Sequence, residues 1–307
     1  MRRLILLSLL AGSLRADSFF LIVSGLGGEP EYEQRFTGWA KDLDKIARAE
    51  PNTKVTTLSG PDATKANLEA KLRSIAADSK ATDSLVLMLI GHGSFDDANY
   101  KFNIPGPDIA ATDLAALLDK IPAQQLIVDM TSASGGALPL LQNQKAKRVI
   151  ITATKSGTEK NATIFARYWI EALRDPAADT DKNEVITALE AFRYAEQKTA
   201  KFFETQNRLA TEHALIEDTG KGDGVKAPAP ENGQGLVAGR FALVHMGSVA
   251  VAARDPEKLK LLKHKEDLEQ QIDELKYKKA SMALPEYRRQ LQTFLVDLAK
   301  TQEELDK

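Results

Sequence analysis

The sequence contains no cysteine among its 307 residues. This absence excludes disulfide bonds, metal sites built from thiolates, and any reaction that depends on a thiol nucleophile. A nucleophile in this protein must therefore carry oxygen or nitrogen.

Long apolar runs are also missing. The short apolar run at residues 4–10 follows Arg2 and Arg3 and precedes small residues that end at Ala16, a pattern typical of a cleaved secretory signal. No later segment approaches the roughly 20 apolar residues that a membrane-spanning helix requires. We therefore expect a signal peptide at residues 1–16, a secreted or periplasmic protein, and no integral membrane segment after cleavage.

A large excess of positive charge is missing as well. The net charge is −2 at pH 7, and removing Arg2, Arg3 and Arg15 with the signal would change it to −5. A chain without a basic excess has no electrostatic reason to bind nucleic acid or anionic membranes. We therefore expect no nucleic-acid partner.

Short apolar runs alternate with longer amphipathic stretches from residue 18 onward, which is typical of an α/β protein with a mainly parallel sheet flanked by helices. The pattern predicts strands at residues 19–24, 55–58, 85–90, 126–129 and 149–152. It predicts helices at residues 36–49, 65–77, 113–120, 136–142 and 161–173, the third with an N-cap signal at Thr112 and Asp113. A sixth strand at residues 240–245 would follow a Gly- and Pro-rich loop over residues 218–239.

The composition changes after Ala253 to Lys, Glu, Gln and Leu, so we divide the chain into a main domain at residues 17–253 and a tail at residues 254–307. Apolar residues recur every seven positions at Leu261, Leu268, Leu275 and Met282, and again at Leu291, Leu298 and Leu305. Pro285 suits the first turn of a second helix. The tail is therefore expected to be an α-helical hairpin or coiled coil that packs on itself or on the main domain, with self-association left open.

Two predicted strands end in residues that can carry chemistry. The third leads into His92 and Gly93, and the fourth leads through Met130 into Ser132. Ligands of parallel sheets bind at the carboxyl ends of the strands, where a histidine and a hydroxyl can meet as base and nucleophile. The Gly93 N–H could serve an oxyanion. Taken alone, a histidine after a strand more often has a structural role, and Ser/Gly-rich turns are common in loops.

The order of these motifs resembles that of the caspase-like cysteine peptidases, in particular the legumain-type (C13-like) group. Gly91-His92-Gly93 resembles the family's strand followed by His-Gly, and residues 132–135 resemble its Cys-x-Ser-Gly turn, with Ser132 in place of the cysteine. The likeness extends over about residues 18–195. It implies a caspase-like three-layer sandwich, with His92 as base, Ser132 at the nucleophile position and Gly93 at the oxyanion hole.

Three positions depart from the family pattern. Gly27 stands where the family has an Asn that orients the histidine, and Met130 stands where it has an acidic specificity residue, so a preference for Asn is not implied. Asp96, Asp97 and Asp129 are the candidates for a group that supports His92. Strand alternation is expected to turn Asp129 away from Ser132.

Serine in place of cysteine leaves three interpretations open. In the first, the site belongs to a pseudopeptidase that binds peptides or protein partners. In the second, it is an active endopeptidase-like hydrolase with Ser132 as nucleophile and His92 as base. In the third, an active cysteine has been replaced by engineering. We favour the first, because a hydroxyl needs much stronger help from its base than a thiol does. An α/β-hydrolase site that uses His213 fits less well, because the G-x-S-x-G elbow is incomplete.

A second pattern places oxygen ligands at the spacing of an EF-hand-like calcium loop. Its members are Asp179, Asp181, Asn183, Val185 through its carbonyl, Thr187 and Glu190. Glu184 occupies the position where such loops usually need glycine. The competing interpretation is an acidic N-terminus that caps a helix over residues 184–203. A structural Ca²⁺ ion is the only cofactor that the sequence suggests.

Overall fold

The structure is a computed structural model that describes residues 16–143, 148–222 and 224–307. The predicted signal peptide, apart from Ala16, lies outside the described residues.

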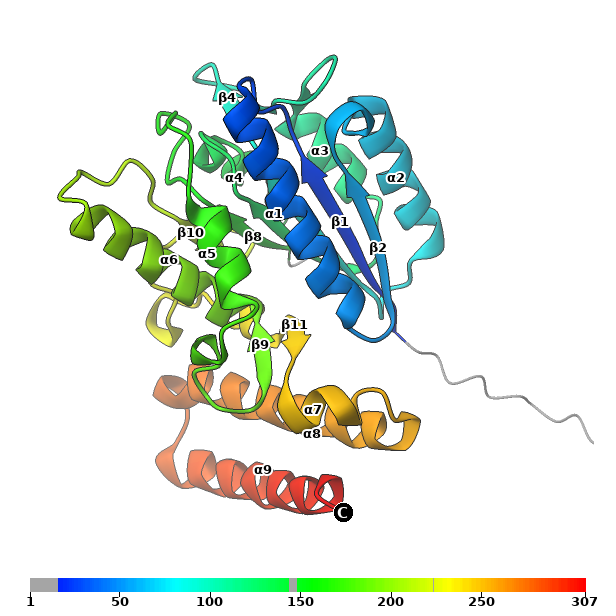
Figure 1. The fold of residues 1–307 in the computed structure, drawn as a ribbon. Coiled ribbons are helices and arrows are strands. Elements are labelled where there is room, and N and C mark those ends of the chain that lie inside the picture. The colour runs from blue at the N-terminus through cyan, green and yellow to red at the C-terminus, as the bar shows by residue number, and fades with distance from the viewer. Residues whose placement is uncertain (1–15, 144–147, 223) are drawn as a thin grey trace, which may run out of the picture.

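A central sheet of six strands forms the middle layer, with the strand order β10-β8-β7-β3-β1-β2 (Figure 1). Its strands are β1 (Ser18–Ser24), β2 (Thr53–Leu58), β3 (Ser84–Ile90), β7 (Gln124–Asp129), β8 (Val149–Thr152) and β10 (Leu215–Glu217). Neighbouring strands are parallel except for β10, which runs antiparallel to β8. All five predicted strands are present, so the expectation of a mainly parallel sheet is confirmed.

Helices cover both faces of this sheet because its strands are apolar on both sides. One face packs against α1 (Pro30–Ala49), α5 (Phe165–Ala172) and α6 (Ala188–Thr205), and the other against α2 (Lys65–Asp78), α3 (Ala111–Leu118) and α4 (Leu138–Leu141). Successive strand residues alternate between the two layers: Phe20 and Ile22 join the first, and Leu21 and Val23 the second. The resulting α/β/α arrangement confirms the fold class.

Shorter elements form the rest of the chain. Two small sheets contain β4 (Gly93–Phe95), β5 (Tyr100–Phe102) and β6 (Ile109–Ala110), and β9 (Val185–Thr187) with β11 (Ala242–His245). The 3-10 turns are η1 (Gly60–Asp62), η2 (Ser134–Gly136), η3 (Pro176–Ala178), η4 (Pro230–Asn232), η5 (Ala238–Arg240) and η6 (Lys279–Ser281).

Two local predictions are corrected. The strand expected at residues 240–245 pairs with β9 rather than with the central sheet, whose sixth strand is the three-residue β10. The N-cap of α3 is Ala110, without a capping side chain, so neither Thr112 nor Asp113 caps the helix. Asp113 lies in the first turn of α3, where its carboxylate forms an ion pair with Lys65 at 2.7 Å.

The C-terminal region consists of α7 (Gly247–Ala252), α8 (Pro256–Lys278) and α9 (Leu284–Leu305), and α8 and α9 form the expected hairpin. In Figure 1, α8 lies between the main domain and α9, which is the outermost layer. Leu268, Leu275 and Leu305 of the predicted heptads are buried, whereas Met282 lies beyond the end of α8. Pro285 is in the first turn of α9, as predicted. Within the described residues, no helix is both long and apolar enough to cross a membrane.

Candidate functional site

His92 follows β3 and lies against α1. Its ring contacts Tyr32 and Phe36 edge-on, with ring centroids 5.1 and 5.2 Å away. Burial lowers the pKa of His92 below its usual value of 6.5, and a hydrogen bond to the Gly27 backbone only partly opposes this effect. The imidazole is therefore neutral at pH 7, which is the protonation state that a general base requires.

The support for His92 comes from the main chain rather than from a carboxylate. Gly27 donates its own N–H to Glu33 at 2.9 Å, and this bond fixes the loop beside the histidine. A Cβ atom at Gly27 would lie 2.3 Å from the Glu33 nitrogen, so an asparagine cannot occupy this position without movement of α1. The Gly27 backbone, which forms a hydrogen bond with His92, thus takes the place of the orienting Asn side chain that this sequence lacks at position 27.

Ser132 lies at the end of β7, beside the residue that follows His92. Its side chain is 2% exposed. The hydroxyl accepts a hydrogen bond from the Gly93 N–H at 3.1 Å and donates one to the Gly93 carbonyl at 3.2 Å. Among the described residues, no hydrogen bond joins the His92 ring to Ser132. The fold therefore brings the predicted residues together, but through the backbone of Gly93.

Gly93 makes this approach possible because it has no side chain. A Cβ atom there would lie 2.4 Å from the Ser132 carbonyl oxygen and 2.5 Å from the Tyr100 ring. Its N–H, expected at an oxyanion hole, donates to Ser132 in this conformation. The N–H becomes available to a substrate only if the Ser132 hydroxyl turns away.

Asp129, the last residue of β7, belongs to a buried hydrogen-bond network. Thr131 donates its N–H and hydroxyl to Asp129 at 3.2 and 2.7 Å, and Tyr100 bonds to the Thr131 hydroxyl at 2.6 Å. Burial raises the pKa of Asp129 to about 6. The Asp129 carboxylate bonds to Thr131 and not to Ser132, although the same Thr131 hydroxyl lies 3.1 Å from the Ser132 carbonyl oxygen.

The other candidate acids do not reach His92. Asp96 accepts hydrogen bonds from the N–H groups of Ala98 and Asn99, which close the turn between β4 and β5, and Asp97 lies in the same turn at φ 70°. Met130 is buried in the apolar core.

His213 lies nearer to the Ser132 turn than its sequence position suggests. Its Nδ1 bonds to the carboxylate of Glu159, whose backbone carbonyl accepts the Ala133 N–H at 2.7 Å. Ala133 adopts a left-handed conformation at φ 57°, so this bond helps to hold the turn. His213 thus braces the turn through Glu159, and no contact between described residues joins it to Ser132.

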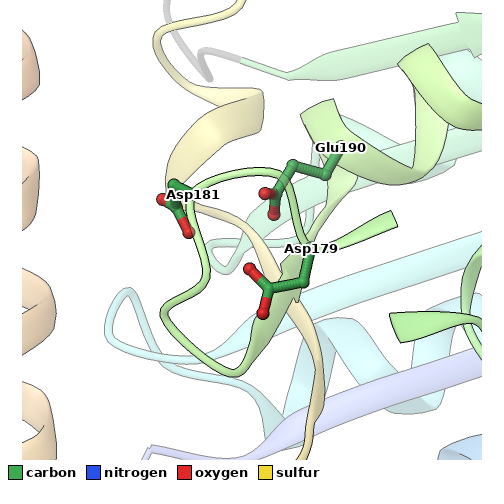
Figure 2. Close-up of side chains that lie close together, drawn as sticks. All are labelled: Asp179, Asp181 and Glu190. Carbon is green, nitrogen blue, oxygen red and sulfur yellow. The ribbon is translucent and has the colours of Figure 1, made fainter. Parts of the chain in front are cut away.

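The predicted calcium loop folds around three carboxylates. Oxygen atoms of Asp179, Asp181 and Glu190 all lie within 4.8 Å of one another (Figure 2). Burial and the neighbouring carboxylate of Glu190 raise the pKa of Asp181 to about 6. Carboxylate oxygens at this spacing are the ligands that Ca²⁺ prefers.

The other members of the loop hold the backbone. Asn183 accepts the Val185 N–H at 2.8 Å, and Thr187 caps α6 in a reciprocal pair with Glu190. The competing interpretation, a helix cap formed by the aspartates, is therefore wrong in detail: α6 begins at Ala188, and Thr187 is its N-cap.

Glu184 can occupy a loop position that usually requires glycine because its side chain has a structural role. Its φ is 65°, in the left-handed region. The carboxylate accepts hydrogen bonds from the Ser248 hydroxyl at 2.6 Å and the Val249 N–H at 3.0 Å, and so caps α7. These bonds offset the backbone strain of a non-glycine residue, which costs about 1–2 kcal/mol.

No protein-family model matches the sequence, and no curated protein matches it. Among solved structures, a protein from Geobacter sulfurreducens is similar with a TM-score of 0.45 and 12% identity, over 72% of this chain and 97% of that one. Caspase-1 from Spodoptera frugiperda is similar with a TM-score of 0.45 and 14% identity, over 66% and 87% of the two chains. The Drosophila initiator caspase Dronc gives 0.42 and 11%, over 67% and 81%. At these identities the similarity concerns the fold alone.

Proposed function

We propose that this protein is an exported caspase-like, legumain-type peptidase homologue whose site around His92 and Ser132 binds a peptide or protein segment without cleaving it. The observation that carries the proposal is the state of the Ser132 hydroxyl. Its proton is donated to the Gly93 carbonyl, and its oxygen accepts the Gly93 N–H.

A serine nucleophile requires a base within hydrogen-bond reach, about 2.6–3.2 Å from its oxygen. Here the neutral ring of His92 is held by Tyr32, Phe36 and the Gly27 backbone instead. Catalysis would require the hydroxyl to break both bonds to Gly93 and turn toward the ring. The active endopeptidase-like hydrolase, with Ser132 as nucleophile and His92 as base, is the alternative that this arrangement disfavours.

Leu26 supports a binding role. It precedes Gly27 at the carboxyl end of β1, where ligands of parallel sheets bind, and it is 42% exposed. Its backbone is fixed by a hydrogen bond from its N–H to the Asn103 carbonyl at 3.0 Å. A fixed and exposed leucine beside His92 suits an apolar side chain of a bound peptide.

Selection from a phage-displayed peptide library against the full chain tests this role. Peptides that bind the wild type are expected to lose at least tenfold in affinity to Leu26→Asp, because a charge replaces the apolar contact. The control is Leu209→Asp, which changes a leucine that is 91% exposed in the loop after α6. Equal loss in both variants, or selected peptides that are cleaved by the wild type, would contradict the proposal.

We also propose that residues 179–190 bind a structural Ca²⁺ ion. Three carboxylates meet within 4.8 Å, and the Glu184 backbone adopts the left-handed conformation that the loop requires. Extracellular calcium is abundant, so even weak affinity would suffice in an exported protein. Calorimetric titration of the full chain with CaCl₂ should give a one-site isotherm, and absence of heat together with an unchanged Tm would remove this proposal.

A further inference from the structure

The outer side of α9 carries an apolar surface, which we call the outer stripe and define as Leu291, Leu295, Val296 and Ala299. These residues, with Arg288 and Gln292, line a shallow groove of about 340 Å³. Leu295 is 48% exposed and Val296 is 47% exposed. Contiguous apolar surface of this kind marks an interaction site in a soluble protein.

The intramolecular packing of α9 is already complete on another side. Thr301 and Leu305 are buried, and α9 packs against α8. Figure 1 shows α9 as the outermost layer, with α8 between it and the sheet. A helix that rests on one neighbour usually presents a polar face to water. The second apolar side of α9 therefore calls for a second partner.

The charges at the ends of the outer stripe indicate what that partner is. Asp306 follows Arg288 by 18 residues, which is five helical turns, so both lie on the same side of α9. Both are exposed; Arg288 makes no ion pair or hydrogen bond with any described residue, and the Asp306 carboxylate accepts a hydrogen bond from the Gln302 amide at 2.8 Å. The first turns of α9 carry Arg288 together with Arg289 and Glu286, which form an ion pair at 2.8 Å, and the residues at its end are Lys300, Glu303, Glu304, Asp306 and Lys307. The net charge is thus +1 at the beginning of the helix and −1 at its end.

A second α9 in the antiparallel direction matches this pattern. Arg288 of each copy then faces Asp306 of the other, and Leu295 faces Ala299. A two-fold axis makes both halves of such an interface identical, so every favourable contact occurs twice. A parallel arrangement would place like charges opposite each other and is disfavoured.

We propose that the outer stripe is a homodimer interface, in which α9 pairs antiparallel with α9 of a second copy of this chain, and the two hairpins form a four-helix arrangement. Helix hairpins pack in this way when each presents an apolar side. The contact involves essentially one helix per copy and is at the small end of stable interfaces. The dimer is therefore reversible, and its population depends on concentration.

Sedimentation of the full chain over about 1–200 µM tests this proposal, since small interfaces dissociate in that range. The wild type should pass from monomer to dimer, and Leu295→Glu should remain a monomer throughout. The matched control is Thr293→Glu, which adds the same charge at an exposed position of α9 away from the stripe. It should dimerise as the wild type does.

Charge exchange tests the antiparallel register. Arg288→Asp or Asp306→Arg alone should raise Kd at least about tenfold, because each places like charges opposite each other twice. The double variant restores opposite charges and should return Kd to within about threefold of the wild type. The proposal would be overturned if the wild type stayed monomeric, or if Leu295→Glu dimerised as the wild type does. It would also be overturned if the double variant showed the summed losses in affinity of the two single variants instead of a restored Kd.

Discussion

The hydroxyl of Ser132 is bonded to both the N–H and the carbonyl of Gly93, at 3.1 and 3.2 Å. These two bonds join the carboxyl ends of β7 and β3 and place Ser132 next to His92 in space. They also occupy the hydroxyl, so the residue at the nucleophile position of the family pattern acts as a structural contact. The same pair of residues explains why a glycine is required after the histidine.

Gly93→Ala should destabilise the protein by at least about 3 kcal/mol, because its Cβ would meet backbone at 2.4 Å and the Tyr100 ring at 2.5 Å. The control is Gly38→Ala, an exposed position within α1 where a Cβ meets no atom within 4 Å. That change should stabilise the protein by about 0.5–1 kcal/mol, because alanine is the better helix former. Urea unfolding measures both, and a Gly93→Ala variant as stable as the wild type would contradict the close approach.

Tyr32→Ala should raise the pKa of His92 toward its usual 6.5, because removing the ring admits water to a histidine whose pKa is lowered by burial. Titration of the His92 ring signals by NMR measures the shift. Tyr287→Ala, on α9, serves as the control and should leave the His92 titration unchanged. An unshifted His92 in the Tyr32 variant would show that burial against α1 is not the cause.

Asp181→Asn should abolish the rise in Tm that Ca²⁺ gives the wild type, because it removes one of the three carboxylates. Without calcium the variant should be at least as stable as the wild type above pH 6, since the pKa of Asp181 is raised to about 6 and its ionised form is therefore disfavoured by folding. Differential scanning calorimetry with and without CaCl₂ measures both effects. Asp297→Asn, at an exposed site on α9, is the control. A full calcium response in the Asp181 variant would exclude that residue as a ligand.

His245 connects the hairpin to the main domain through a pH-dependent contact. Its Nδ1 lies 2.7 Å from Glu50, at the end of α1, and its Nε2 lies 3.5 Å from Glu266 of α8. Burial alone would lower the pKa of His245, but Glu266 and Glu50 outweigh it and raise the pKa to about 9. The raised pKa means that protonation favours folding, so the stabilisation is complete below about pH 6.5 and is lost as the pH rises through 9.

His245→Gln should therefore cost roughly 3 kcal/mol at pH 6 and much less at pH 10, because the pKa is raised from 6.5 to about 9 and each pKa unit corresponds to about 1.36 kcal/mol. Urea unfolding at several pH values measures the difference from the wild type. His264→Gln, which removes an exposed histidine of α8, controls for the loss of a histidine as such. A cost for His245→Gln that does not change with pH would exclude the ion pairs as its source.

Apolar periodicity predicted the five parallel strands because four of them contain continuous runs of buried residues, such as residues 85–90, while β2 at the sheet edge is only partly buried. It missed β10, because three residues are too few to show a period. It also assigned residues 240–245 to the central sheet, because the local sequence of a strand does not indicate its pairing partner. The approach of Ser132 to Gly93, the residue after His92, could be expected, since the two residues follow neighbouring strands of one sheet.

The details that decide the chemistry were not predictable from local patterns. The contact of Ser132 with the Gly93 backbone and the support of His92 by Gly27 both depend on main-chain atoms, which carry no sequence signature. The position of Glu184 is similar. Its carboxylate caps α7, which is 63 residues away at Gly247, and only the folded chain shows why glycine is not needed there.

Labelling with a serine-reactive fluorophosphonate tests the central claim most directly, because the reagent reports whether Ser132 is an activated nucleophile. The wild type, Ser132→Ala and His92→Ala are treated in parallel, and labelled protein is measured by mass spectrometry. With the hydroxyl held by Gly93 and no base bonded to it, the wild type should be labelled no more than Ser132→Ala. Labelling of the wild type that is lost in both variants would contradict the binding role and establish an active serine hydrolase.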